Sequence, residues 1–261
     1  MPSLLLCLAG HSLRSMIAYR TQFWIELLGA GVRLATGVLS LTVIFGNVGT
    51  INGWSEASAG VVLGVFFIVT GLHGIVFGPS ISALSGYDGA IVSGTLDFHL
   101  LRPRSTQVLV SVSRWAPLIC VELIIGSVLV ARALASLESE LSAWQIVVFI
   151  CSVFMSVSIL YSLTLSLASL MFWKADFLFT WLLRPVVQMA RFPADLYPGW
   201  LKLLLTWIVP VGVLTTVPAQ ILLHGISLPM LSAAGALAAG GLVATNLLFR
   251  AGLRRYASAS S

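Results

Sequence analysis

Long stretches without a charged residue constrain this chain more than any other feature. No Asp, Glu, Lys or Arg occurs in residues 57–87, 141–173 or 203–249. The chain is 58% hydrophobic and 9% charged, whereas soluble domains carry about 25% charged residues. A single soluble core could not bury so much apolar surface. The sequence therefore predicts an all-α polytopic membrane protein, because helical spans need about 20 apolar residues and barrel strands would alternate.

Six membrane-spanning helices are expected in one transmembrane domain that covers residues 1–261. The expected spans are 22–46, 58–78, 108–134, 143–172, 177–193 and 229–250. Residues 22–172 then hold spans one to four, 173–250 hold the last two, and 251–261 form a cytoplasmic tail. Polar and apolar residues recur at helical spacing in residues 3–20, which predicts an interfacial helix within 1–21.

A seventh apolar stretch, residues 199–225, is broken by Pro210 and Pro218 into pieces too short to span. Arginines near both termini place both on the cytoplasmic side, so the number of crossings should be even. We therefore expect 199–225 to form a re-entrant helix pair between spans five and six, buried in protein. In the alternative, 177–193 stays cytoplasmic and 199–225 crosses, an arrangement that charge bias alone mildly favours.

A short polar segment, GTLDFHLLRP at residues 94–103, lies in the connection 79–107 between spans two and three. With the N-terminus inside, this connection is cytoplasmic. A short amphipathic helix is expected between Gly89 and Pro103. Its apolar stripe would consist of Ile91, Leu96 and Leu100, and Asp97 and His99 would project elsewhere. Such a helix can rest on lipid headgroups or fit a groove on a partner.

This segment resembles the first cytoplasmic loop of type 2 ABC exporter permeases, which carry a G-T-(L/acidic)-x-x-L-L-x-x-P pattern. The matching residues are Gly94, Thr95, Leu96, Asp97, Leu100, Leu101 and Pro103. In that family the segment is the coupling helix that docks on the ATPase subunit. The resemblance implies the same role here, with Ile91, Phe98 and Arg102 in the same helix.

A second resemblance lies nearer the C-terminus. The stretch from Arg191 to Pro218 is similar to the family's F/Y-P-x-x-x-x-P-x-W/L…P sequence, which follows the fifth span and forms a re-entrant pair on the outer side. The matching residues are Arg191, Phe192, Pro193, Pro198 and Pro210. This resemblance implies the six-span subfamily and favours 177–193 as span five.

The family resemblance implies a permease subunit of an ATP-driven exporter in the bacterial cytoplasmic membrane. Two permease chains, identical or related, would form the substrate path on a dimer of ABC ATPase subunits. No G-x-x-x-x-G-K-[ST] motif occurs, so ATP and Mg²⁺ are expected in the ATPase partner and no cofactor or metal in this chain. Membrane lipids are expected partners, and no basic run suggests nucleic acid.

Charged residues within spans are costly and usually face a cavity or a partner. Glu26 and Arg33 lie seven residues apart on one face of span one, and Glu122 and Arg184 are expected in the middle of spans three and five. These four residues are the candidates for the translocation path. Structural ion pairing among them is the other interpretation. If Arg33 faces the path, an anionic or amphipathic substrate is favoured.

An enzyme is disfavoured, because the four histidines form no H-x-x-x-H or H-E-x-x-H motif and no paired carboxylates share a mid-membrane face. The rival interpretation is a stand-alone secondary transporter or a membrane scaffold. Secondary transporters often contain inverted repeats with a broken helix in each half. Here the broken stretch occurs only in the C-terminal half, and copurification with an ATPase would discriminate the two.

Overall fold

The computed structural model describes residues 20–46, 48–85, 89–101, 103, 105–138, 141–174 and 179–256. The long helices are α2 (Arg20–Phe45), α3 (Glu56–Val76), α7 (Cys120–Ser136), α8 (Ala143–Ser169) and α12 (Leu228–Arg255). The shorter helices are α4 (Gly78–Leu84), α5 (Asp97–Leu100), α6 (Thr106–Ser111), α9 (Phe179–Met189), α10 (Gly199–Leu203) and α11 (Val211–His224). The expected interfacial helix of residues 1–21 and the end of the tail lie outside the described residues.

Short turns and one hairpin complete the described elements. The 3₁₀ turns are η1 (Pro117–Ile119), η2 (Leu170–Phe172) and η3 (Ala194–Leu196), and η4 (Leu204–Ile208) is a π-helical turn. Strands β1 (Thr50–Ile51) and β2 (Trp54–Ser55) pair antiparallel. Their turn is Asn52-Gly53, and both residues have positive φ, 52° and 83°, as a tight type I′ hairpin requires.

The prediction of an all-α polytopic membrane protein is confirmed. Within the described residues, five helices are long and apolar enough to cross a membrane, or six if α10–η4 and α11 count as one bent span. The third span begins at Pro117, so the expected start near residue 108 was wrong. Residues 106–111 form the separate helix α6. The reason is Pro117, which holds Ala116 in a non-helical conformation and starts a new helix.

Helices α8 and α12 lie side by side and run in the same direction. Met155 of α8 lies beside Gly235 of α12, and Ser162 further along α8 accepts a hydrogen bond from Thr245 of α12 at 3.0 Å. Two parallel neighbours require the chain between them to return across the bundle. One further crossing must therefore lie between residues 172 and 228.

Helix α9 and the residues after it make this return. Leu183 of α9 lines a cavity with Leu160 of α8, whereas Asp195 reaches Trp54 at the hairpin, at 3.1 Å. The chain between them therefore runs from the middle of the bundle to its hairpin end. The described part of α9 has 11 residues, which at about 1.5 Å per residue is shorter than a hydrocarbon core.

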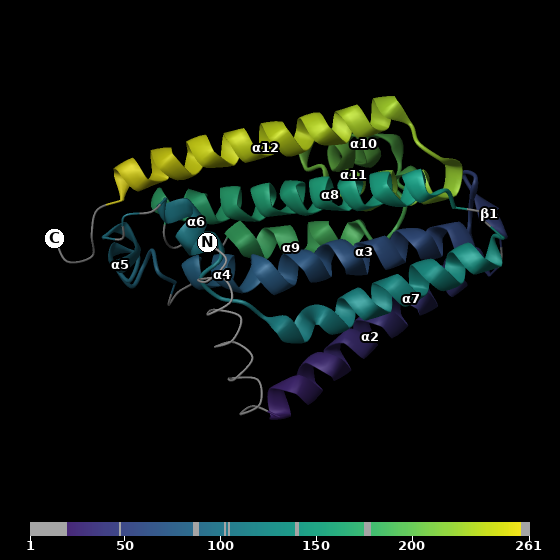
Figure 1. Ribbon diagram of the computed structural model, residues 1–261, viewed down its shortest axis with the longest axis horizontal. Coiled ribbons are helices and arrows are strands. Elements are labelled where there is room, and N and C mark those ends of the chain that lie inside the picture. Colours follow the sequence, from purple (N-terminus) through teal and green to yellow (C-terminus); the bar gives the residue numbers. More distant parts are fainter. Residues whose placement is uncertain are drawn as a thin grey trace.

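Helices α10 and α11 form a bent pair that begins and ends at the hairpin end (Figure 1). Lys202 of α10 pairs with Asp195, and Gln145 at the start of α8 donates a hydrogen bond to the Ile221 carbonyl near the end of α11, at 3.5 Å. The two halves meet at an angle of 91°. Their backbone thus enters the bundle and leaves on the same side, which is the arrangement of a re-entrant pair.

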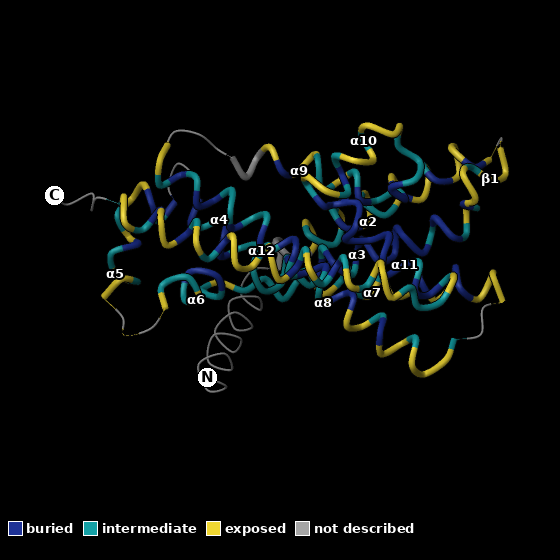
Figure 2. The backbone as a smooth tube through the Cα atoms, turned by 90° about the horizontal axis from the view of Figure 1, so that it is seen from above, coloured by how far each residue is buried: buried dark blue, intermediate teal, exposed yellow. Residues whose placement is uncertain are grey.

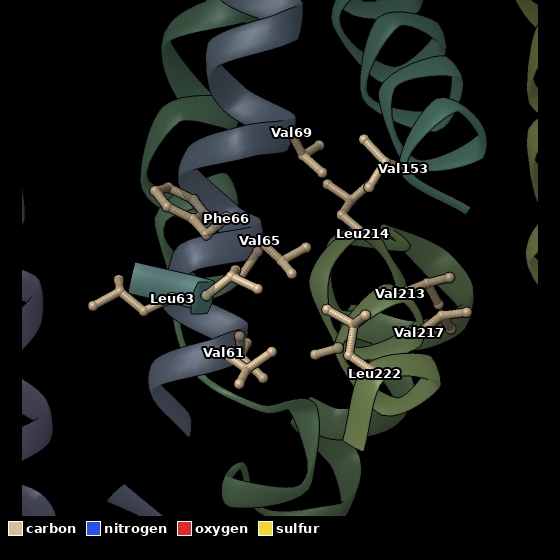
Figure 3. Packing of buried hydrophobic residues seen from close by; sticks show 14 of the residues in the cluster. Val61, Leu63, Val65, Phe66, Val69, Val153, Val213, Leu214, Val217 and Leu222 are labelled. Atoms are coloured by element: carbon tan, nitrogen blue, oxygen red, sulfur yellow. The ribbon is translucent and has the colours of Figure 1, made fainter. Parts of the chain in front are cut away.

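Helix α3 occupies the centre of the bundle, and it is the most buried of the long helices (Figure 2). Its apolar residues meet α11 on one side, where Leu214 projects between Val69 of α3 and Val153 of α8 (Figure 3). Buried hydroxyls of α8 bond to their own helix, as Ser156 does to the Ser152 carbonyl. Helix α3 is apolar on all sides, and this explains how other helices can surround it.

Glycines bring α3 and α7 into close contact. A Cβ built on Gly64 would lie 2.8 Å from the Gly126 carbonyl oxygen, and one built on Gly126 would lie 2.6 Å from the Gly64 carbonyl oxygen. Neither position has room for a side chain. This backbone approach is the small-residue packing that joins helices in membranes, where lipid tails are as apolar as the side chains.

A second apolar core lies at the end of the bundle opposite the hairpin, which we call the α5 end. It joins the segment after α4 to the ends of α8 and α12. Its buried members are Ile81, Leu84, Ile91, Leu96, Val110, Leu165, Ala168, Met171 and Phe249. The chain between spans two and three is thus packed against the helical bundle.

Candidate functional site

The segment that resembles a coupling helix is a folded loop with one helical turn. Gly94 has φ of 74°, a conformation that glycine adopts without strain. The chain therefore reverses before α5 begins. Leu96 is fully buried in the second core, and Ile91 is 6% exposed. The loop is consequently anchored by its first half.

The second half of this segment exposes apolar side chains. Phe98 is 70% exposed, Leu101 is 82% exposed and Leu100 is 43% exposed. The expected stripe of Ile91, Leu96 and Leu100 was wrong, because α5 has only four residues and helical spacing does not extend back across Gly94. Pro103 follows in a bend, and Arg102 lies outside the described residues.

Asp97 connects this segment to the end of α12. Burial, and then the negative charge of Asp97, raise the pKa of the Tyr256 phenol above its ordinary value. The Tyr256 ring also packs on Phe172, with centroids 5.9 Å apart. Phe172 in turn fills the space over Gly252, where no side chain would fit. The contact of Tyr256 could not be predicted from the sequence pattern, since it depends on where α12 ends.

Arg33 and Glu122 form an ion pair between α2 and α7, with 2.6 Å between Nη2 and Oε1. Arg191 lies close enough to both for electrostatic interaction, and its guanidinium lies 5.4 Å from the centroid of the Phe66 ring. Glu26, on the same helix as Arg33, also acts electrostatically on Glu122, so two arginines and two carboxylates lie near one another here. Glu122 is in the first turn of α7, so its expected place in the middle of span three was wrong, because that span starts later than expected.

A cavity of about 440 Å³ lies between α3, α4, α8 and α9. Its polar wall contains Thr70, His73, Ser82, Ser85, Thr164, Arg184 and Gln188. His73 Nε2 lies 3.1 Å from Thr164 Oγ1, and the Thr164 hydroxyl also contacts the Leu160 carbonyl at 2.9 Å. Arg184 lines this cavity and is therefore not part of the Arg33–Glu122 ion pair.

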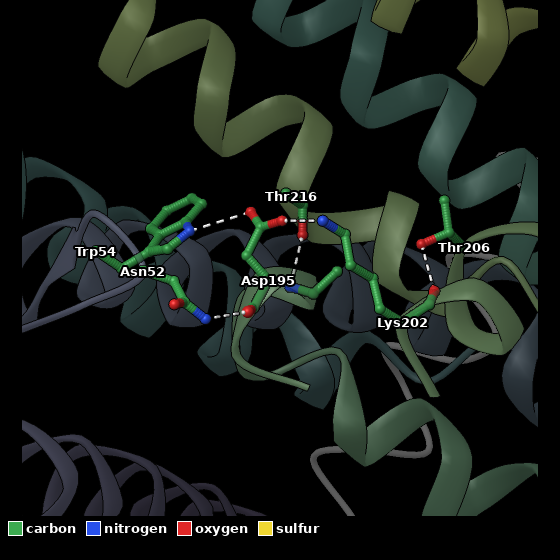
Figure 4. A network of polar contacts seen from close by, with 7 residues as sticks. Asn52, Trp54, Asp195, Lys202, Thr206 and Thr216 are labelled. Carbon is green, nitrogen blue, oxygen red and sulfur yellow. Dashed lines mark hydrogen bonds and ion pairs between the residues drawn. The ribbon is translucent and has the colours of Figure 1, made fainter. Parts of the chain in front are cut away.

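The re-entrant region is fastened to the hairpin through Asp195 (Figure 4). Trp54 Nε1 donates to Asp195 Oδ2 at 3.1 Å, and Asn52 Nδ2 donates to the Asp195 carbonyl at 2.8 Å. Lys202 Nζ lies 2.7 Å from Asp195 Oδ1. The Ala194 amide donates to the Thr216 hydroxyl at 3.3 Å. These contacts hold the turn before α10 against α11 and the hairpin.

The re-entrant residues expected from sequence lie along this turn. Pro193, Pro198 and Pro210 directly precede η3, α10 and α11, and Phe192 packs on the main core. The sequence reasoning missed the hairpin residues Asn52 and Trp54. Asn-Gly at 52–53 is the strongest short hairpin signal and could have located the turn. The contact of Asn52 with Asp195 could not have been located in this way, because Asp195 lies 143 residues away from Asn52.

No group of His, Cys, Asp and Glu among the described residues could hold a metal ion. The helical spans and the bent pair of α10–η4 and α11 define a multi-pass helical membrane protein. A family model described as ABC-2 family transporter protein matches residues 32–260, so the chain belongs to this family of membrane transport permeases. Comparison with curated proteins and with solved structures gives no match.

Proposed function

We propose that this chain is the permease subunit of an ATP-driven exporter. Two chains, identical or related, form the substrate path, and a separate ATPase dimer binds ATP and Mg²⁺. The observation that carries the proposal is the exposed apolar pair Phe98 and Leu101, presented by a turn that Leu96 anchors in the second core. Apolar side chains exposed on this connection need a surface to cover them, and the family resemblance assigns that surface to the ATPase subunit.

The second core supports the transmission of force from this patch. Leu96 contacts a core shared with Leu165 of α8 and Phe249 of α12, and Ser80 of α4 exchanges hydrogen bonds with the backbone of Arg114, at 2.8 and 2.9 Å. A push on α5 therefore acts on several spans together. Such a linkage supports a mechanism in which the two halves rotate as rigid bodies between inward- and outward-facing states.

The distribution of basic residues supports the orientation of the chain. Arg114 bonds to Ser80 of α4, and Arg250, Arg254 and Arg255 lie in the last turns of α12. The end of α12 lies beside α5 (Figure 1). Cytoplasmic loops carry an excess of Lys and Arg. We therefore assign the α5 end, and with it both termini, to the cytoplasmic side of a bacterial inner membrane, and the hairpin to the outer side.

The exposed face of α2 supports a second permease chain. Trp24, Leu28, Val32, Leu39 and Val43 are exposed and recur mostly at intervals of four, so they form a stripe along the helix. Lipid or another chain must cover this stripe. The family resemblance assigns span one to the interface between permeases, and the remaining apolar surface contacts membrane lipids.

Copurification of an ATPase tests the proposal. The tagged chain is isolated from native membranes in mild detergent as wild type, as Phe98→Glu/Leu101→Glu, and as the control Val48→Glu. Val48 is 61% exposed near the hairpin, at the other end of the bundle. We expect the wild type and the control to retain ATPase protein and ATP hydrolysis, and the double variant to lose both at equal membrane abundance.

Two results would contradict the proposal. If no ATPase accompanies the wild type, the secondary transporter or scaffold becomes the working interpretation. If the double variant retains the ATPase as well as the wild type does, then α5 is not the docking site and the partner binds another surface.

A further inference from the structure

We propose that the cavity between α3, α4, α8 and α9 binds a small amphipathic molecule with one anionic head, and that Arg184 binds this head. Binding to this cavity does not depend on the proposed function. Only the interpretation of the ligand as a transported substrate rests on the proposed function. The cavity of about 440 Å³ is in the range of ordinary small-molecule sites, about 300–1,000 Å³. Nothing in the sequence pattern located this cavity, because it depends on the packing of four helices.

The charge of the wall selects the sign of the ligand. Arg184 is exposed and forms no ion pair with any described residue, whereas Arg33 and Lys202 are both paired with carboxylates. No Asp or Glu is among the described residues that line this cavity. A guanidinium at membrane depth is costly without a counter-charge. An anionic head supplies that charge and accepts two parallel hydrogen bonds from the guanidinium plane.

The rest of the wall fits an amphipath. Gln188 lies one helical turn after Arg184, so both face the same side of α9, and Ser82 is on the facing helix α4. These groups can hydrogen-bond further oxygens of the head. Ile81, Leu160, Leu183 and Val187 complete the wall with aliphatic surface. A carboxylate, sulfate or phosphate head on a short apolar tail satisfies both parts of the wall.

The cavity belongs to the half of the bundle away from the hairpin. Thr70 and His73 are in the second half of α3, and Thr164 is in the last turns of α8, both of which run toward the α5 end. In the proposed orientation this is the cytoplasmic half. A ligand could therefore enter from the cytoplasm or the inner leaflet, as an exported molecule must.

Binding is tested on the purified permease without any ATPase, in nanodiscs of phosphatidylcholine alone. The probe is 11-(dansylamino)undecanoic acid, with its methyl ester as the neutral counterpart, and empty nanodiscs give the background. We expect saturable binding of the acid and at least about tenfold weaker binding of the ester. Arg184→Gln should weaken binding of the acid by about tenfold or more. Arg184→Lys, which keeps the charge, should weaken it by about threefold or less.

Arg132→Gln is the matched control, because Arg132 is an exposed arginine that lines a different cavity, between α2, α3 and α7. It should leave binding unchanged. The melting temperature of each variant is measured, and binding is compared only among variants that melt at the same temperature as the wild type. A folding defect is recognised in this way. Equal binding of acid and ester, or an Arg184→Gln variant that binds the acid as tightly as the wild type, would overturn the proposal.

Competition separates a small amphipath from a membrane lipid. Decanoate should displace the probe from the wild type. Displacement by phosphatidylglycerol but not by decanoate would assign the cavity to a lipid headgroup and overturn the substrate class. Because no ATPase is present, failure of this test leaves the docking experiment intact, and failure of the docking experiment leaves this one intact.

Discussion

At the scale of single residues, the Arg33–Glu122 pair links α2 to α7. The side chain of Glu122 is 13% exposed and that of Arg33 is 37% exposed, so removal of either partner leaves a charge in poorly solvated surroundings. We predict that Arg33→Gln and Glu122→Gln each lower the free energy of unfolding by about 1–3 kcal/mol. Chemical unfolding in bicelles measures this loss.

The double variant Arg33→Gln/Glu122→Gln provides the control for this prediction. The double variant removes the charge that each single variant leaves without its partner at this contact, so its loss should be smaller than the sum of the single losses by at least about 1 kcal/mol. Strict additivity of the two single losses would show that the pair contributes nothing beyond the separate side chains.

Tyr197 gives the chain a dependence on alkaline pH. Its hydroxyl donates to the Met189 carbonyl at 2.7 Å, and burial raises the pKa of Tyr197 from 10.0 to about 12. A raised folded pKa means that the stabilisation is complete below the unfolded pKa. It is lost as pH rises from about 10 to about 12, because the unfolded chain ionises first.

We predict that Tyr197→Phe removes this part of the alkaline destabilisation. Near neutral pH the variant should be less stable by about 1 kcal/mol, since a hydrogen bond is lost. Between pH 10 and 12 the difference from the wild type should shrink or reverse. Melting temperatures over this range measure it, and parallel curves for both proteins would contradict the assignment to Tyr197.

The site residues differ in how far sequence could predict them. The pairing of Arg33 with Glu122 was one of two interpretations, because charges in spans must be neutralised. Arg184 could not be separated from this pair, since its surroundings depend on the rotation of α9. The Trp54–Asp195 contact joins residues 141 positions apart, and a pattern in one segment contains no information about such a contact.

At the scale of elements, the Gly64–Gly126 contact fixes the distance between α3 and α7. We predict that Gly126→Ala destabilises the protein by about 1–3 kcal/mol, because a methyl group would force backbone atoms 2.6 Å away to move. Gly240→Ala on α12 is the control, since no atom lies within 4 Å of its built Cβ. That variant should be neutral or slightly stabilised, because alanine favours a helix.

The elements themselves were predictable where apolar length alone defines them. Spans two, four and six agree with α3, α8 and α12 to within a few residues except at the end of α12, which continues to Arg255. The third span and α5 were less predictable. Their limits are set locally by Pro117 and by the positive φ of Gly94, which apolar length alone does not indicate.

At the scale of the whole molecule, the direction of each crossing follows from the parallel arrangement of α8 and α12. Since α9 returns the chain to the hairpin end, residue 174 and residue 200 should lie on opposite sides of the membrane. Residues 48 and 200 should share the outer side, and residues 105 and 174 the inner side. This arrangement differs from the alternative in which 199–225 makes the fifth crossing.

Cysteine labelling of intact cells measures this topology. In a background with the native cysteines replaced by serine, we predict that a membrane-impermeant maleimide labels Val48→Cys and Trp200→Cys in intact cells. Ser105→Cys and Lys174→Cys should react only after permeabilisation, and all four positions are exposed. If Trp200→Cys is protected until permeabilisation while Val48→Cys is labelled, α10 begins on the cytoplasmic side and the pair is a broken span. The reverse pattern at all four positions would invert the chain and place α5 where no cytoplasmic ATPase could reach it.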